Sequence, residues 1–109
     1  MSHTVAEMTE QAGISYRQLD YWTTNGYLAV DDRNPGTGIY RRWPARSLMK
    51  ATVAKRLIDA GIATPRAVEL AEGIRALPHA IRIGPGLTLL IEPDAPESPL
   101  PELHAGGLA

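Results

Sequence analysis

The sequence contains no cysteine among its 109 residues. A disulfide scaffold, a cysteine-based zinc site and a cysteine nucleophile are therefore excluded, and the composition fits a reducing compartment. No apolar run approaches the ~18 residues of a membrane span, and no charged-then-apolar signal segment opens the chain. We therefore expect a cytoplasmic protein without a membrane partner.

Residue patterns for catalysis and metal binding are also scarce. The histidines, His3, His79 and His104, are scattered and show no paired-ligand spacing. The serines have no identifiable histidine and aspartate partners. The segment Gly84-Pro85-Gly86 separates two apolar runs, whereas a phosphate-binding loop precedes a helix. We expect no enzymatic activity, no bound metal and no cofactor.

The formal net charge is −1, but the charged residues are unevenly divided. Residues 1–56 contain eight bases and five acids, whereas residues 57–109 contain three bases and seven acids. From Arg33 to Arg56 there are seven bases and no acid. Such a stretch can meet phosphates, although a solvated face gives the same pattern. Charge alone therefore leaves both interpretations open.

The start and stop signals of two short helices occupy the first part of the chain. Residues 4–7 and 15–18 each have the spacing of a capping box, in which two side chains satisfy the first free amides of a helix. Gly13 ends the first helix because glycine adopts the left-handed conformation without steric cost. The second helix runs to about Asn25. Two short helices joined by a tight glycine turn are typical of a helix-turn-helix.

A hairpin and a longer helix are predicted next. Turn-forming residues fill 31–38, and short β-prone runs at 27–30 and 39–43 flank them, which predicts a wing. Pro44 suits the first turn of a third helix that runs to about Ala60. The apolar residues of this helix lie on two sides, as is usual for a helix that is central to a domain.

The last part of the chain is predicted to hold a helix, a second hairpin and a tail. Thr64 and Pro65 have the character of an N-cap and a first helical residue, and we expect this fourth helix to end at Pro78. Apolar runs at 80–83 and 87–91 predict the hairpin. From residue 93 onward, prolines, acids and small residues predict disorder. The fold class is therefore mainly α with a small β wing, with four helices and a C-terminal β-hairpin.

Three segments resemble the winged helix-turn-helix DNA-binding domain of the MerR type. They are GISYRQLDYW at 13–22, GYL at 26–28 and GIYRRW at 38–43. The family pattern is a Gly-apolar-Ser turn, an Arg, a Leu and an aromatic pair in the recognition helix, Gly-Leu-Leu, and a wing that ends in Gly, Arg-Arg and an aromatic residue. The resemblance covers about residues 2–75, and excisionases and phage DNA-packaging proteins are similar to a lesser degree.

The chain departs from the MerR pattern in three ways. Asp20 stands where many relatives carry a second arginine, and Tyr27 replaces the commoner leucine. A long C-terminal dimerisation helix is not evident, so coiled-coil dimerisation and ligand sensing are not implied. We divide the chain into a MerR-like DNA-binding domain (1–62), a helix and hairpin extension that is a candidate dimerisation element (63–92), and a tail (93–109).

The first turn of the second helix is the predicted DNA reader, because a helix fits the major groove and its N-terminal residues reach base edges. A tyrosine hydroxyl one turn later either contacts a phosphate or is partly buried. Adjacent arginines on the wing point to opposite faces, so one should pack inward while the other meets DNA. Sequence does not choose between them. The candidate DNA-binding residues are Ser15, Tyr16, Arg17, Gln18, Tyr21, Tyr40, Arg41 and Arg42. Leu19, Trp22 and Trp43 are assigned to the core.

The sequence thus predicts a protein that binds specific double-stranded DNA sites, a transcriptional regulator by family resemblance. One module contacts few phosphates, so tight binding should need two copies or a partner protein. The run at 81–91 can pair edge to edge in a homodimer, or it extends the domain's own sheet or covers its core. Two other functions stay open: a DNA-bending architectural factor of the excisionase or packaging type, and a protein-interaction module without DNA binding.

Overall fold

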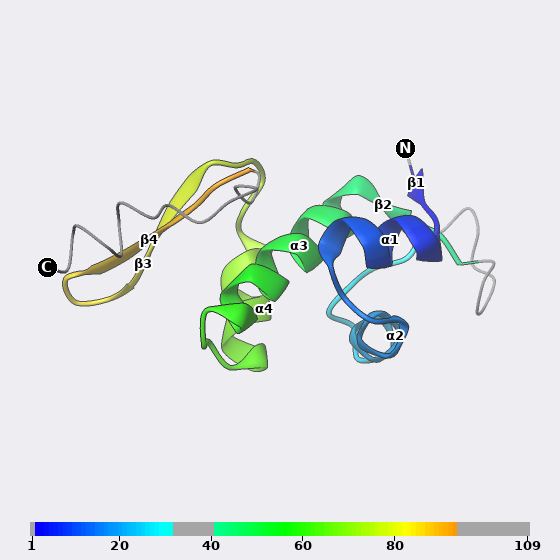
Figure 1. Cartoon of the computed structure of the whole chain (residues 1–109), viewed down its shortest axis with the longest axis horizontal. Coiled ribbons are helices and arrows are strands. Elements are labelled where there is room, and N and C mark those ends of the chain that lie inside the picture. Colours follow the sequence, from blue (N-terminus) through cyan, green and yellow to red (C-terminus); the bar gives the residue numbers. More distant parts are fainter. Residues whose placement is uncertain (1, 32–40, 94–109) are drawn as a thin grey trace, which may run out of the picture. The chain divides into compact units, whose positions relative to one another are not determined.

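The computed structural model describes residues 2–31 and 41–93. The chain divides into two compact units, Met1–Ala76 and Leu77–Ala109. The predicted wing tip, Tyr40 and the predicted disordered tail from residue 94 onward lie outside the described residues. The predicted mainly α class is confirmed, because the described residues form four helices and a C-terminal antiparallel hairpin (Figure 1). The elements are β1 (Ser2–His3), α1 (Val5–Ala12), α2 (Tyr16–Thr24), β2 (Trp43–Pro44), α3 (Ala45–Asp59), α4 (Thr64–Glu72), β3 (His79–Gly84) and β4 (Leu87–Ile91).

Both predicted capping boxes are present and set the starts of α1 and α2. The Thr4 hydroxyl accepts a hydrogen bond from the Glu7 amide at 3.2 Å, and the Thr4 amide donates to the Glu7 carboxylate at 2.9 Å. Such caps satisfy amides that the helix itself leaves free. Gly13 follows α1 with φ 75°, and its amide donates to the carbonyl of Thr9. The turn between the two helices therefore uses the left-handed conformation that the sequence predicts.

Helix α3 is central to the first unit, as its two apolar sides predict. It packs against α1 on one side and α4 on the other (Figure 1). The predicted core positions Leu19, Trp22 and Trp43 are all buried. Helix α2 thus holds its apolar residues inward while its polar side faces solvent. Other buried core residues of this unit include Met8, Ile14, Leu28, Ala51, Val53, Leu57, Ala67 and Val68.

The strands near the wing differ from the prediction. Residues 27–30 form no strand, because the amides of Tyr27 and Leu28 donate to the carbonyl of Trp22 and close the end of α2. Residues 41 and 42 are also outside any strand, although the Asp31 amide donates to the Arg42 carbonyl at 2.7 Å. The predicted pairing of 27–30 with 39–43 is therefore wrong in the part that the structure describes.

Strand β2 pairs instead with the amino-terminal strand β1. The pairing is antiparallel, with Ser2 opposite Pro44 and His3 opposite Trp43. Neither run is long or alternating enough to give a periodic signal, so the sequence did not predict it. This small sheet joins the beginning of the helix-turn-helix to the segment that leads into α3.

Helix α4 is shorter than predicted at its carboxyl end. Thr64 is its first residue rather than its N-cap, and the helix ends at Glu72, before Gly73. Glycine is a poor helix former, and it ends this helix well before Pro78. Ile74 follows the helix and is nevertheless buried.

The predicted second hairpin is present as β3 and β4. It pairs His79 with Ile91 and Ile81 with Leu89, and its tight turn contains Gly86 with φ 72°. Within the described residues these two strands form a sheet of their own, so the hairpin does not extend the β1–β2 sheet. In the same ranges, no helix has the length and apolar character needed to cross a bilayer.

Candidate nucleic-acid interface

The amino end of α2 presents polar and aromatic side chains to solvent. Ser15 is the N-cap, and its hydroxyl accepts the amide of Gln18 at 3.0 Å. Tyr16 is 49% exposed, and Arg17 is exposed as well. In residues 2–31 and 41–93 the Arg17 guanidinium has no hydrogen-bond or ion-pair partner. Arg17 is therefore a cation that the fold leaves available, beside free helix amides that favour an anion.

Gln18 and Tyr21 have different environments. The Gln18 side-chain oxygen accepts the Ser15 amide at 3.0 Å, which completes the capping box. Gln18 thus holds the start of α2, and its side-chain NH₂ group is the part left for a base edge. Tyr21 is 58% exposed, one turn beyond Arg17. Of the two readings left open for Tyr21, partial burial does not describe this side chain.

Arg41 is the arginine that packs inward. Its Nη2 donates to Oδ1 of Asp20 on α2 at 2.7 Å, and its side chain is 13% exposed. The guanidinium carbon lies 5.4 Å from the ring centre of Trp43, a distance typical of a cation–π contact. Its buried Nε has no hydrogen-bond partner among the described residues. Arg41 thus links the end of the wing to α2, and its guanidinium is already engaged there.

The Trp43 indole extends the same link. Its Nε1 donates to the Thr23 hydroxyl at 3.0 Å, and that hydroxyl donates to the Leu19 carbonyl at 2.7 Å. The ring itself is completely buried. We call Asp20, Thr23, Arg41 and Trp43 the wing–helix clasp. The clasp fixes the described end of the wing segment on α2, which carries the candidate reader residues.

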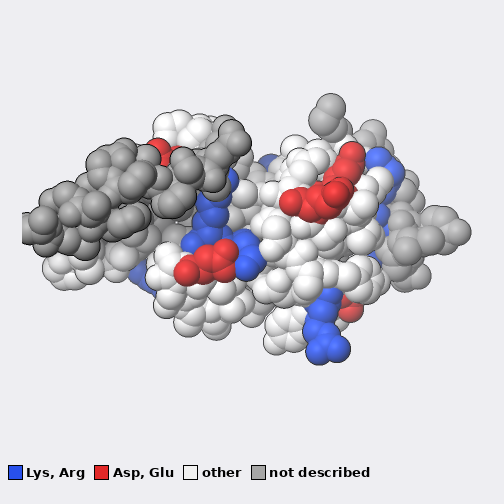
Figure 2. Space-filling model, viewed as in Figure 1, with Lys and Arg blue, Asp and Glu red and all other residues white. Residues whose placement is uncertain are grey.

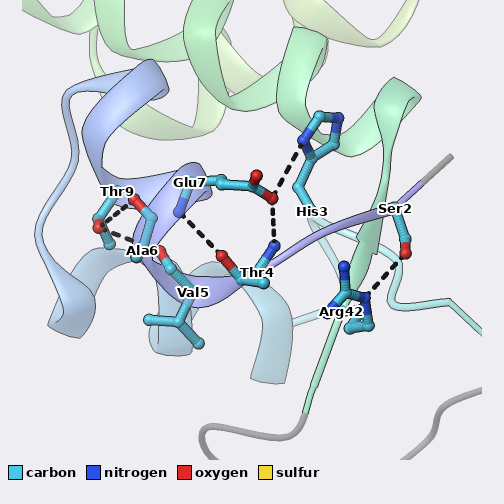
Figure 3. Close-up of polar contacts among 8 residues, drawn as sticks. All are labelled: Ser2, His3, Thr4, Val5, Ala6, Glu7, Thr9 and Arg42. Carbon is cyan, nitrogen blue, oxygen red and sulfur yellow. Dashed lines mark hydrogen bonds and ion pairs between the residues drawn. The ribbon is translucent and has the colours of Figure 1, made fainter.

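Arg42 lies toward the amino-terminal strand. Its Nε donates to Oγ of Ser2 at 2.9 Å (Figure 3). Glu7 is close by, and its Oε1 lies 3.6 Å from Nδ1 of His3. The Thr4 backbone hydrogen bond lowers the pKa of Glu7, and His3 and Arg42 act in the same direction. Both arginines are intermediate in exposure, but the Arg41 guanidinium binds a carboxylate whereas the Arg42 guanidinium binds a hydroxyl.

Sequence reasoning missed the partners that hold these candidates. Asp20 stood out only as a departure from the family pattern, but its carboxylate binds Arg41. The contacts of Thr23 and Ser2 could not be predicted from the sequence. Each hydroxyl bonds a residue twenty or more positions away, and hydrophobic periodicity does not indicate such pairs. The opposite charges of Asp20 and Arg41 were the one available hint, and sequence alone does not pair charges across such separations.

Basic side chains also gather beside acidic ones over α3 and α4 (Figure 2). Lys50 bonds Glu72 between the two helices, and Lys55 pairs with Asp59 along α3. These lysines are thus used within the fold. Among the described residues, no cluster of three or more histidine, aspartate and glutamate side chains is arranged to hold a metal ion.

The capped helices α1 and α2, joined through Gly13, form a helix-turn-helix, and the whole arrangement is consistent with the winged type. Comparison with curated proteins gives the same class. A stretch of 52 residues is 38% identical to proteins named uncharacterized HTH-type transcriptional regulators, from Mycobacterium bovis and from two strains of Mycobacterium tuberculosis. The match spans 47% of this chain and 23% of each relative's length. No family model matches the chain.

Proposed function

We propose that the protein is a non-enzymatic, sequence-specific DNA-binding regulator of the MerR-like winged type. The observation that carries this proposal is Arg17, an exposed guanidinium that has no partner among the described residues and lies in the first turn of the second helix of a helix-turn-helix. In this geometry α2 enters the major groove, and Arg17 donates bidentately to guanine. The names of the mycobacterial relatives support the regulatory role.

The other contacts follow from the positions of the side chains. Tyr16 and the NH₂ group of Gln18 flank Arg17 at base edges, while Ser15 presents the helix amides to a phosphate. The exposed Tyr21 hydroxyl reaches the backbone of the DNA. Arg42 contacts a phosphate at the wing, together with Tyr40. Arg41 acts as a positioning residue, because Asp20 already binds its guanidinium.

Selection from random-sequence DNA tests this function. The native chain is expected to enrich one motif, and Arg17→Ala is expected to lose about 1–3 kcal/mol of binding free energy, which is about a 5- to 150-fold loss of affinity. The matched control is Arg66→Ala, which removes an equal charge from an exposed arginine on α4 that pairs with Glu69. Equal retention of the native chain and both variants at low salt would refute the proposed reader. Absence of any enrichment by the folded native chain at low salt would instead favour the protein-interaction module.

We also propose that a second copy of the chain binds at the β3–β4 hairpin. Within the described residues each strand has one unpaired edge, and β4 has the sequence LTLLI without a charge or a proline. Such an edge is a template for pairing with another chain. Leu87 and Leu90 are 58% and 64% exposed. Antiparallel pairing of β4 with β4 of the second copy about a two-fold axis uses the same surface on both copies, as a symmetric dimer requires.

Sedimentation analysis of the full-length chain tests this interface. We expect a dimer, and we expect Leu90→Lys to dissociate it, because a charge then lies at the strand edge. Ala76→Lys adds the same charge to an exposed residue outside the hairpin and should leave the dimer intact. A native chain that stays monomeric, or a Leu90→Lys variant that stays dimeric, would contradict the proposed interface.

A further inference from the structure

A cavity of about 490 Å³ lies within the first unit, between the segment that follows α2, the start of α3 and the end of α4. Its volume falls in the range of small-molecule sites, about 300–1,000 Å³. The proposed DNA contacts do not use it, because none of the candidate reader residues lines it. Its apolar lining includes Tyr27, Ala29, Met49 and Ile74.

Three cations and one acid share this cavity. Arg46 and Lys50 come from α3, whereas Glu72 and Arg75 come from the end of α4 and the residues after it. Lys50 bonds Glu72, so this pair is internally neutralised. Arg46 and Arg75 are exposed, and across ranges 2–31 and 41–93 neither has a hydrogen-bond partner or an ion pair within contact distance. Two positive charges of this cavity are therefore uncompensated at short range.

The three cations all act electrostatically on the Glu72 carboxylate. The hydrogen bond and charge of Lys50 lower the pKa of Glu72, and the charges of Arg46 and Arg75 add to this lowering. All three cations line the same cavity as this carboxylate. Glu72 balances one of them, and the combination leaves an excess of positive charge beside an apolar wall. Arginine is well suited to planar anions because its guanidinium donates in a fixed fork.

We propose that this cavity binds a small organic anion. The carboxylate or phosphate of this anion pairs with Arg46 and Arg75, and the apolar part of the anion lies against Tyr27 and Ile74. A DNA backbone would meet the two guanidiniums without using the apolar lining, whereas an amphipathic small molecule uses both features. The site goes beyond DNA recognition and does not depend on it.

Amide chemical shifts of the full-length ¹⁵N-labelled chain test the site with defined probes. Phenyl phosphate and benzoate supply both an anionic head and an apolar ring, while inorganic phosphate supplies the head alone. We expect saturable shifts confined to residues 26–29, 44–50 and 71–75. We expect at least one ring-bearing anion to bind at least tenfold more tightly than inorganic phosphate. Tighter binding of phenyl phosphate would indicate a phosphate ligand, and tighter binding of benzoate would indicate a carboxylate ligand.

The matched variants are R46Q/R75Q and R66Q. Both arginines of the double variant are exposed, so the core is unchanged, and we expect at least a tenfold loss of affinity. Arg66 is an exposed arginine of α4 outside the cavity, and R66Q should bind within twofold of the native chain. Equal affinity for ring-bearing anions and inorganic phosphate would overturn the proposal, as would unchanged binding by the double variant. A loss of DNA retention in R46Q/R75Q as large as that in Arg17→Ala would also overturn it, because the two arginines would then be phosphate contacts.

Discussion

Replacing Trp43 by alanine is expected to lower the free energy of unfolding by about 3–5 kcal/mol. The indole is completely buried, so its removal leaves a cavity that the surrounding side chains fill only partly. The change also removes the Nε1 hydrogen bond to Thr23 and the ring under Arg41. Small domains have about 5–15 kcal/mol of total stability, so a large part would be lost. Urea denaturation followed by far-ultraviolet circular dichroism measures the change.

Trp43→Phe separates the ring from its hydrogen bond. Phenylalanine keeps an aromatic surface for Arg41 but cannot donate to Thr23, so we expect a loss of about 1–2 kcal/mol, smaller than for alanine. A Trp43→Ala variant that is as stable as Trp43→Phe would show that the buried ring contributes little. That result would contradict the central place of Trp43 in the clasp.

Arg41→Met is expected to lower the free energy of unfolding by about 2 kcal/mol. Methionine keeps much of the aliphatic length, so the loss reports mainly the charge-assisted hydrogen bond to Asp20, about 1.5–3 kcal/mol, and the contact with Trp43, about 1 kcal/mol. The Asp20 side chain is half-exposed, and water screens part of the sum. Chemical denaturation of the variant and the native chain gives the difference.

The neighbouring Arg42 is the natural control for Arg41. Its hydrogen bond goes to Ser2 rather than to a carboxylate, so Arg42→Met should cost about 1 kcal/mol or less. In a double-mutant cycle, Asp20→Asn should have a smaller effect beside Arg41→Met than in the native chain. Additive effects of the two substitutions would contradict the ion pair as a source of stability.

The starts of α1 and α2 were predictable because local chemistry decides them. The capping boxes at Thr4 and Ser15 use side chains three residues apart, so all the interacting groups lie in one short window. The end of α4 was harder to predict. Gly73 ends the helix there, whereas Pro78 carried the more conspicuous stop signal in the sequence.

Contacts between distant segments limited the prediction of the site. Sequence predicted that one of two adjacent arginines packs inward, but the contact with Asp20 on helix α2 decides that it is Arg41. The exposed state of Arg17 followed from the helical period once α2 was placed, because Leu19 and Trp22 face inward, whereas the sequence left the exposure of Tyr21 open. The pairing of β1 with β2 joins segments about forty residues apart, and two-residue strands have no pattern to detect.

The β1–β2 pairing has a practical consequence for handling the protein. Because Ser2 already pairs with Pro44, an affinity tag or fluorescent fusion joined at the amino end would begin within one residue of a hydrogen-bonded strand. Added residues there would compete for the register and would lie beside the Ser2–Arg42 hydrogen bond. A tag at the carboxyl end leaves this register untouched. Binding assays with carboxyl-tagged protein should therefore report the native wing segment more faithfully than assays with an amino-terminal fusion.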